Sequence, residues 1–367
     1  MTSGSLDASK TGESAHIHRF RTHAAYLRAL RQLALGSNHH LFDQINPSKL
    51  IEHGLSDLVA RVDKQTFTGK AGPDVDTDEV LACLNRAWGT ELILATTVAL
   101  ASTSDVVGLA NSWGSVQAYY AVYGAVQAVL VAEGHVRPDN HQGTQRSFVD
   151  LWTYRRIDLA PWTLAAAAIG SKSADPDGFI GGPGRPLNLS LHPWSGWSGD
   201  ECWDISALAL RSTRRRHREE RCDAARERKR TQRRKEFNAH QKEREQAGKK
   251  PLKQPSWWDS KPQLSKTDRA DIESKLRPIT LLDHLFRLRI RANYEDALMF
   301  SEGPETQWAA QLWAANLVAL TSASLLVHER RLTHLLGEAF MHGAEDEWLG
   351  RHGSAVTGGL ALRRQVL

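Results

Sequence analysis

The chain contains 367 residues, of which 41% are hydrophobic and 24% are charged, and its formal net charge is +5. These proportions are typical of a globular protein that is long enough to bury a full core as one elaborated domain or two. No apolar run reaches the roughly 18 to 20 residues needed to cross a bilayer, which argues against a membrane-spanning protein.

The N-terminal segment and the cysteines indicate a cellular location. Residues 1–14 have no apolar core, so they predict a loose tail and not a secretory signal. Cys83, Cys202 and Cys222 are scattered, which favours a reducing compartment over a disulfide framework or a zinc site. We therefore expect a cytoplasmic protein that has no membrane contact.

The N-terminal third predicts three helices. Apolar residues recur at helical spacing over residues 18–36 and again over 47–62. Glycine and proline cluster in residues 64–73, which predicts a loop. Residues 76–101 then form a third amphipathic pattern, with Thr77 as the expected cap. No strand alternation of useful length appears, so the sequence predicts an all-α protein.

The next helix carries three tyrosines and is the most informative stretch of the chain. Small residues lie among its apolar positions and would let a neighbouring helix approach closely, and Gly134 is a stop signal. Its apolar positions recur every three to four residues and fall on one face. They are Val116, Tyr119, Tyr120, Tyr123, Val126 and Leu130.

A different pattern begins near Ile157. Glycine and proline are too dense between Asp175 and Pro186 for a regular element, and Trp194, Trp197 and Trp203 predict an irregular loop packed on the core. Residues 205–247 then predict a long helix that ends before Pro251 and Pro255. Its centre has almost no apolar residues, so it cannot be buried along its length.

The C-terminal third again shows helical patterning. It runs from residue 266 to 298 and continues in two expected helices over residues 305–326 and 328–341. Beyond Gly343 the chain is short and glycine-containing, which predicts a frayed tail. The expected organisation is a disordered tail (1–14), an N-terminal helical extension (15–75), the first part of a bundle (76–157), an insertion with a basic helix (158–276), the second part of the bundle (277–342) and a C-terminal tail (343–367).

The run Ala118-Tyr119-Tyr120-Ala121-Val122-Tyr123 resembles the central helix of the HEPN superfamily. The segment from Arg287 to Asp296 is similar to the Arg-x-x-Ala-Asp-Tyr-x-Asp pattern in a later helix of many HEPN proteins. The family comprises small helical bundles found in RNA-targeting toxins, phage-defence proteins and partners of minimal nucleotidyltransferases. The resemblance therefore implies a HEPN-like bundle, with the segment between the two motifs as a surface insertion.

Active HEPN ribonucleases share an Arg-(polar)-x(3–5)-His motif, and two copies of it face each other across a homodimer. The nearest match is Arg137-Pro138-Asp139-Asn140-His141, so the resemblance implies Arg137 and His141 as catalytic residues with neither metal nor cofactor. Histidine can move a proton near neutral pH, and arginine can hold phosphate oxygens. The alternative is that residues 137–141 form a turn between two helices, in which His141 caps the second.

The positive charge of the chain belongs to one segment. Residues 211–250 contain 17 Lys or Arg against 7 Asp or Glu, a local balance of +10 that leaves −5 for the remainder. Such blocks suit salt-dependent contacts with phosphates, although a mixed-charge helix can also be a solvated face with internal pairing. The predicted nucleic-acid-binding residues are Arg214, Arg215, Arg216, Arg228, Lys229, Arg230, Arg233, Arg234 and Lys235.

Together these patterns predict an RNA-targeting HEPN-like protein, a metal-independent endoribonuclease in defence or toxin activity. The expected partners are RNA or another nucleic acid, a second copy of the chain and a nucleotidyltransferase-type protein. The alternative is a catalytically silent HEPN-like module that docks nucleic acid or a protein through the basic helix. A helical scaffold that does not bind nucleic acid is the third hypothesis.

Overall fold

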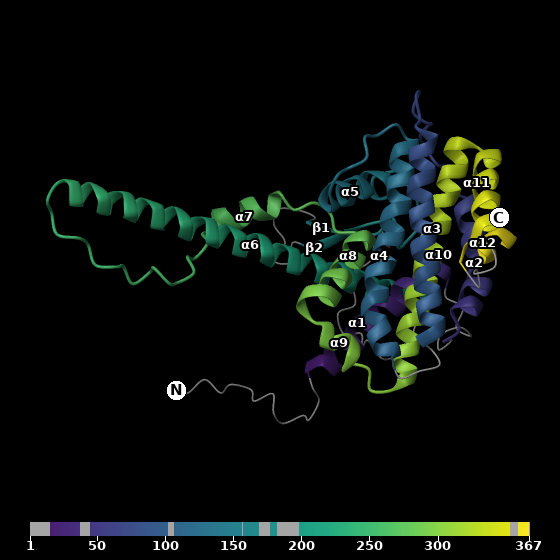
Figure 1. Ribbon diagram of the computed structural model, residues 1–367, viewed down its shortest axis with the longest axis horizontal. Helices are drawn as coiled ribbons and strands as arrows, with labels where there is room; N and C mark the ends of the chain where they lie inside the picture. Colours follow the sequence, from purple (N-terminus) through teal and green to yellow (C-terminus); the bar gives the residue numbers. More distant parts are fainter. Residues whose placement is uncertain are drawn as a thin grey trace.

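A computed structural model describes residues 15–36, 45–101, 106–155, 157–168, 177–181, 198–352 and 359–366. The all-α prediction is confirmed, because helices account for most of these ranges (Figure 1). The expected tail 1–14, Trp194 and Trp197 lie outside the described residues. The helices are α1 (Ala15–Leu35), α2 (Pro47–Asp63), α3 (Thr77–Ala101), α4 (Val107–Ala132), α5 (His141–Phe148), α6 (Gly199–Gln246), α7 (Lys266–Ser274), α8 (Leu281–Ile290), α9 (Ala297–Ser301), α10 (Gln307–Leu336), α11 (Glu338–His352) and α12 (Leu360–Val366).

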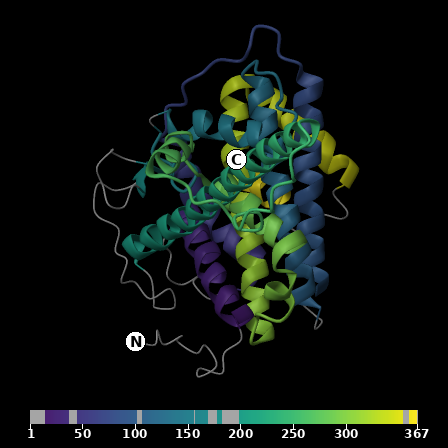
Figure 2. The ribbon, with the colours of Figure 1, turned by 90° about the vertical axis from the view of Figure 1, so that its left-hand side faces the viewer.

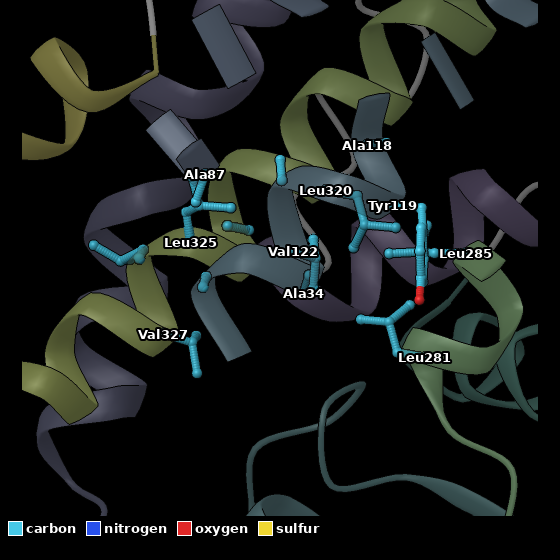
Figure 3. Packing of buried hydrophobic residues seen from close by; sticks show 14 of the residues in the cluster. Ala34, Ala87, Ala118, Tyr119, Val122, Leu281, Leu285, Leu320, Leu325 and Val327 are labelled. Atoms are coloured by element: carbon cyan, nitrogen blue, oxygen red, sulfur yellow. The ribbon is translucent and has the colours of Figure 1, made fainter. Parts of the chain in front are cut away.

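Helix α4 forms the centre of the bundle, between α3 and α10 and against α8. Figure 3 shows Val122 of α4 in one cluster with Leu320 and Leu325 of α10. A Cβ atom at Gly124 would lie 3.2 Å from the carbonyl oxygen of Cys83 in α3. The small residues of α4 therefore allow the close helix approach that the sequence predicted.

Two of the described helices, α4 and α10, are long and apolar enough to cross a membrane by length and composition alone. However, 89% and 94% of their most apolar stretches are buried inside the fold. Burial of this kind is typical of the core helices of a globular protein, because the apolar surface is covered by other helices and needs no lipid.

Helix boundaries at α3 and α10 differ from the prediction. The cap of α3 is Asp76, whose carboxylate accepts a hydrogen bond from the Glu79 amide at 2.9 Å, and not Thr77. The break expected between the helices over 305–326 and 328–341 is absent, because α10 continues without interruption to Leu336, and residues 338–341 belong to α11. The break between α10 and α11 falls at Gly337, whose φ of +89° is the left-handed conformation that glycine adopts at low cost.

The prediction of a frayed C-terminal tail is wrong. Residues 343–367 include the end of α11 and all of α12, and α12 is held to the bundle by Arg363, whose side chain is fully buried. Its guanidinium pairs with Glu91 of α3 and Glu329 of α10. Helix α12 is therefore a structural part of the core.

The long basic helix α6 leaves the bundle as an arm. In Figure 1 it extends to the left of the body, and in Figure 2 it points towards the viewer in front of the bundle. It begins six residues earlier than predicted, because Ser198 and Glu201 form a capping box. Trp203 therefore lies buried in the first turns of this helix and not in the loop where we placed it.

The arm consists of α6 and a non-helical segment that returns along it (Figure 1), and not of a single free helix. The chain returns along α6 after Gln246, and Phe237 of α6 packs edge-on against Trp258 of the returning segment with ring centroids 5.5 Å apart. Arg234 covers the same Trp258 ring at 4.9 Å, and its Nη2 donates to the Trp258 carbonyl oxygen at 2.6 Å. These contacts keep the arm extended, because the aromatic rings shield its inner side from water.

The segment predicted as a surface insertion is anchored in the core at both ends. Trp162 is fully buried, and its Nε1 donates to the Ser324 hydroxyl of α10 at 3.1 Å. Two short antiparallel strands, β1 (Ala165–Ala168) and β2 (Asp177–Ile180), follow, and Ala166 of β1 bridges to Ile279 just before α8. The strands were not predicted, since β1 consists of four alanines and β2 is only four residues long, so neither shows an alternation of apolar and polar residues.

Buried histidines predict how the stability of the fold depends on pH. Burial lowers the pKa of His284 and of His328 to about 4. The His328 Nδ1–H donates to the Ser324 carbonyl oxygen at 2.7 Å, and Nε2 accepts from Trp152 Nε1 at 3.2 Å, so the neutral ring has both partners. In the unfolded chain both rings titrate near pH 6.5.

We expect the free energy of unfolding to fall as the pH drops from about 6.5 to 4. Over that pH range the histidines are protonated in the unfolded chain but stay neutral in the folded protein. The free energy of unfolding therefore falls by about 1.4 kcal/mol per pH unit for each histidine. Urea titrations at pH 7 and pH 5 measure it. His328→Leu is expected to lower the pH slope by about one third, because burial also lowers the pKa of His23, which contributes to the slope together with His284. An equal slope in that variant would contradict the assignment.

Candidate functional site

His141 is the first residue of α5, directly after the turn that joins α4 to α5. The alternative hypothesis of a turn between two helices is therefore close to the structure, but its assignment of His141 as the cap is wrong. The turn leaves α4 at Gly134, whose φ is +79°. The cap of α5 is Asn140, whose side-chain oxygen accepts from the Gly143 amide at 2.8 Å. Since Asn140 supplies the cap, the imidazole of His141 at the first helical position is free for another role.

The imidazole of His141 packs among aromatic rings. Its centroid lies 5.4 Å from that of Tyr119, 5.2 Å from Tyr123 and 5.3 Å from Phe286. The Tyr119 hydroxyl lies 2.8 Å from His141 Nδ1. Helical spacing aims both tyrosines of α4 at the ring, and Phe286 reaches it from α8. His141 is thus held in a fixed orientation with Nδ1 engaged by a phenol.

The positive charge beside His141 comes from Arg289 of α8. Its guanidinium carbon lies 5.8 Å from the ring centroid of Tyr119, 5.2 Å from that of Tyr120 and 5.4 Å from that of Phe286. Such stacking fixes the planar head while leaving its edge for an anion. Sequence reasoning missed Arg289 as a site residue, although it lies in the Arg287–Asp296 segment that carried the second resemblance.

Burial and then the positive charge of Arg289 lower the pKa of His141 from its usual value. Burial raises the pKa of Tyr119 far above its usual value, so its phenol stays protonated. At neutral pH the pair is therefore a neutral imidazole hydrogen-bonded to a neutral phenol. A neutral imidazole can accept a proton from a substrate, which is the first requirement of a general base.

Arg137, the predicted partner of His141, points elsewhere. Its Nε forms an ion pair with Glu79 Oε1 of α3 at 3.0 Å, and both side chains are about one-third exposed. The structure does not bring Arg137 and His141 into contact. Arg289 occupies the position beside the imidazole that the sequence motif assigned to Arg137.

The predicted nucleic-acid-binding residues of α6 divide into two groups. At the root of the arm, Arg214 is fully buried and pairs with Glu273, so its prediction as a phosphate contact is wrong. The next two residues, Arg215 and Arg216, are exposed. Arg216 pairs with Glu220 at 3.2 Å and contacts Glu295 at 3.7 Å.

The remaining six cations belong to the part of α6 between residues 228 and 235, farther along the arm that extends from the bundle in Figure 1. Arg228, Arg233 and Lys235 are exposed. Lys229 pairs with Asp268 of α7 at 2.5 Å, and Arg230 pairs with Glu227 at 2.7 Å. Internal pairing thus neutralises part of the predicted set, as the solvated-face hypothesis expected, and three exposed cations remain most accessible to a phosphate backbone.

An exposed apolar face lies next to the His141 cluster. Ile93 of α3 and Trp113 of α4 are each 57% exposed, and Tyr120 is 37% exposed. With Gln117 and Gln127 they line a groove of about 480 Å³. Large apolar side chains gathered at one place on a surface are typical of interaction sites.

Across the described ranges no group of three or more His, Cys, Asp or Glu side chains is placed to hold a metal ion. The chain matches no protein-family model, no curated protein and no solved structure. The resemblance to HEPN proteins therefore stays a prediction, and the functional argument rests on the geometry of the arm and of the His141 cluster.

Proposed function

We propose that the protein targets RNA and that the α6 arm binds the RNA backbone. The observation that carries this proposal is a 48-residue helix that extends beyond the bundle with exposed arginines and lysines. A helix of this composition gains little from packing, whereas its charges attract a polyphosphate chain strongly and without regard to base sequence. The proposal includes a cytoplasmic location, which the scattered cysteines favour, and a role in defence or toxin activity, which the HEPN resemblance implies.

RNA affinity is expected to fall steeply as salt rises. Each phosphate contact contributes about 0.7 to the slope of log K against log salt for single-stranded RNA. The double variant Arg233→Gln/Lys235→Gln should therefore lower the magnitude of that slope by about 1.4. Fluorescence anisotropy of a labelled RNA oligonucleotide over a salt series measures both slopes.

A matched control comes from Arg137, which carries the same charge but lies on the bundle and pairs with Glu79. Arg137→Gln should leave the salt slope unchanged. An unchanged slope in the arm variant, or a wild-type affinity that does not respond to salt, would contradict binding by the arm. No RNA binding by the wild type even at low salt would favour the helical scaffold.

We further propose that His141 cleaves the bound RNA. A ribose 2′-hydroxyl gives its proton to a neutral imidazole and attacks the adjacent phosphorus, and the bond from phosphorus to the 5′-oxygen breaks. The products are a 2′,3′-cyclic phosphate and a 5′-hydroxyl, the latter formed when an imidazolium donates a proton. Arg289 would hold the phosphate oxygens as negative charge develops on them.

The two proton transfers need a base and an acid at once, which a second copy of His141 would supply in a homodimer. The apolar groove beside the cluster supports this arrangement, since a second copy of the chain would cover Trp113. A nucleotidyltransferase-type protein remains the other proposed partner, on the HEPN resemblance alone. A catalytically silent module is the alternative and would bind RNA without turnover.

Trp113→Glu is expected to convert the dimer to a monomer. A buried interface tryptophan typically contributes 2 kcal/mol or more, which corresponds to a dissociation constant raised about 30-fold or more. Sedimentation velocity over a concentration series measures the change. Trp308→Glu is the control, because Trp308 is also half-exposed but lies on α10; a wild-type chain that sediments as a monomer throughout would contradict the dimer.

A further inference from the structure

Where α6 leaves the bundle, the structure has a wide cleft of about 970 Å³. It lies between the first turns of α1, the root of α6 and the segment that runs from α8 through the π-helical turn η4 (Arg291–Glu295). Its volume lies at the upper end of the range for small-molecule sites in proteins. Its arginines are Arg19, Arg211, Arg215, Arg216, Arg287 and Arg291.

The cleft carries an excess of positive charge. Three carboxylates, Glu219, Glu295 and Asp296, also line it, which leaves three more arginines than acids in the lining. The excess is two when Glu220, which accepts from Arg287 Nη1 at 3.1 Å, is counted with them. Six guanidinium groups from four elements, α1, α6, α8 and η4, thus line one concave surface.

Some of these arginines are held by ion pairs and some are crowded by like charges. Arg19 Nε pairs with Asp296 at 2.6 Å, and Arg287 pairs with Glu295 at 2.5 Å. Arg291 lies 3.7 Å from Asp296. Burial and then the charge of Arg287 lower the pKa of Arg291. Burial and then the charges of Arg215 and Arg218 lower the pKa of Arg211, so an anion bound between them would relieve their repulsion.

The walls of the cleft are not entirely cationic. Tyr26 and Leu298 also line it, and Leu298 is 48% exposed. The ring of Tyr26 is fixed by edge contact with His23, at 5.7 Å between centroids. A ligand with a charged end and an organic end would satisfy both kinds of wall.

We infer that this cleft binds a molecule that carries two or more phosphates, with the guanidinium groups of α6 and η4 on the phosphates. Arginine suits this role because its planar donors pair with phosphate oxygens in a bidentate manner. The phosphates belong either to a free nucleotide or to the 5′-triphosphate end of an RNA strand. This inference does not depend on cleavage at His141, since neither His141 nor Arg289 lines the cleft.

Binding of inorganic tripolyphosphate, measured by isothermal titration calorimetry in low salt, tests the inference on the full chain. We expect one site per chain and a dissociation constant raised about tenfold to a hundredfold in Arg215→Gln/Arg291→Gln. The arm variant Arg233→Gln/Lys235→Gln is the matched control, since it removes two charges outside the cleft. A thermal melt of each variant checks that the fold is kept.

The failure of this inference is distinct from failure of the proposed function. No binding of tripolyphosphate to the wild type, or equal weakening in the cleft and arm variants, would overturn the cleft site whatever the RNA result. Two RNA oligonucleotides, with 5′-triphosphate or 5′-hydroxyl ends, then separate the sources. Loss of the preference for the triphosphate end in the cleft variant assigns the site to RNA ends, and no preference in the wild type assigns it to a free nucleotide.

Discussion

Replacing Arg363 by methionine is expected to lower the free energy of unfolding by about 3 to 5 kcal/mol, the cost of breaking a buried ion pair from one side. Its guanidinium has no exposure and lies between Glu91 and Glu329, which are 2% and 1% exposed. Nη1 donates to Glu91 at 2.5 Å and to Ser322 Oγ at 2.8 Å, and Nε donates to Glu329 at 2.7 Å. Methionine fills a similar volume but leaves two carboxylates buried without a cation.

The charge of Arg363 is strongly coupled to both carboxylates. Burial alone lowers its pKa, but Glu329 and then Glu91 raise the pKa above the usual arginine value. The loss of stability should therefore be electrostatic, and removing a carboxylate as well should recover part of it. We expect Arg363→Met/Glu91→Gln to be more stable than Arg363→Met.

Urea denaturation followed by circular dichroism measures these differences, with the slope against urea as a check on cooperativity. The control is Arg351→Met, which removes an exposed arginine paired with Glu347 four residues earlier. Such surface pairs contribute about 1 kcal/mol or less. Equal loss in Arg363→Met and Arg351→Met would contradict a core role for α12.

The C-terminal helix also shows what local sequence patterns miss. Residues after Gly343 predict a frayed end because glycines interrupt the short apolar pattern. Gly359 has a φ of +59°, and a Cβ there would lie 2.9 Å from the Glu91 carboxyl carbon. The glycine is required by its contact with Glu91 of α3. Because Glu91 is far away in the sequence, the spacing of residues around Gly359 does not predict this contact.

Elements with a strong local signal were predicted well. The periodic apolar residues of α1, α2 and α4 predicted helices close to those observed. The prediction of a single apolar face on α4 is wrong, because α4 is buried on nearly every side at the centre of the bundle. The start of α6 was missed, although Ser198 and Glu201 have the spacing of a capping box. Stability of the long arm away from the core comes from contacts with the returning segment, which composition alone does not reveal.

The predicted catalytic pair fails as a pair for a physical reason. Nearness in sequence placed Arg137 with His141, but the turn between them directs Arg137 back to Glu79 of α3. The packing of α8 on α4 instead carries Arg289 to the tyrosines that hold His141. Arg289 reaches the site because α8 packs on α4. A motif that relates residues within one short segment could not identify it.

His141→Ala is expected to slow RNA cleavage by about 10² to 10⁴-fold, the contribution of one general acid–base group. Arg289→Gln should slow it by about 10² to 10³-fold, because developing charge on the phosphate loses its cation. Incubation of the protein with total RNA in EDTA, followed by analysis of the ends for 2′,3′-cyclic phosphate, measures each rate. Circular dichroism melts establish that both variants keep the fold.

Arg137→Gln tests whether Arg289, as the structure indicates, or Arg137, as the sequence motif predicts, acts with His141. It is expected to cleave at the wild-type rate, since its guanidinium lies in the Glu79 pair and not beside the imidazole. Loss of cleavage in Arg137→Gln with full activity in Arg289→Gln would support the pairing of Arg137 with His141 that the sequence motif predicts. It would also exclude Arg289 as the cation that acts with His141. If the wild type binds RNA through its arm and no product with a cyclic end forms, His141 is a packed residue of a binding module. In that case the cluster of tyrosines around it serves to join α4 to α8.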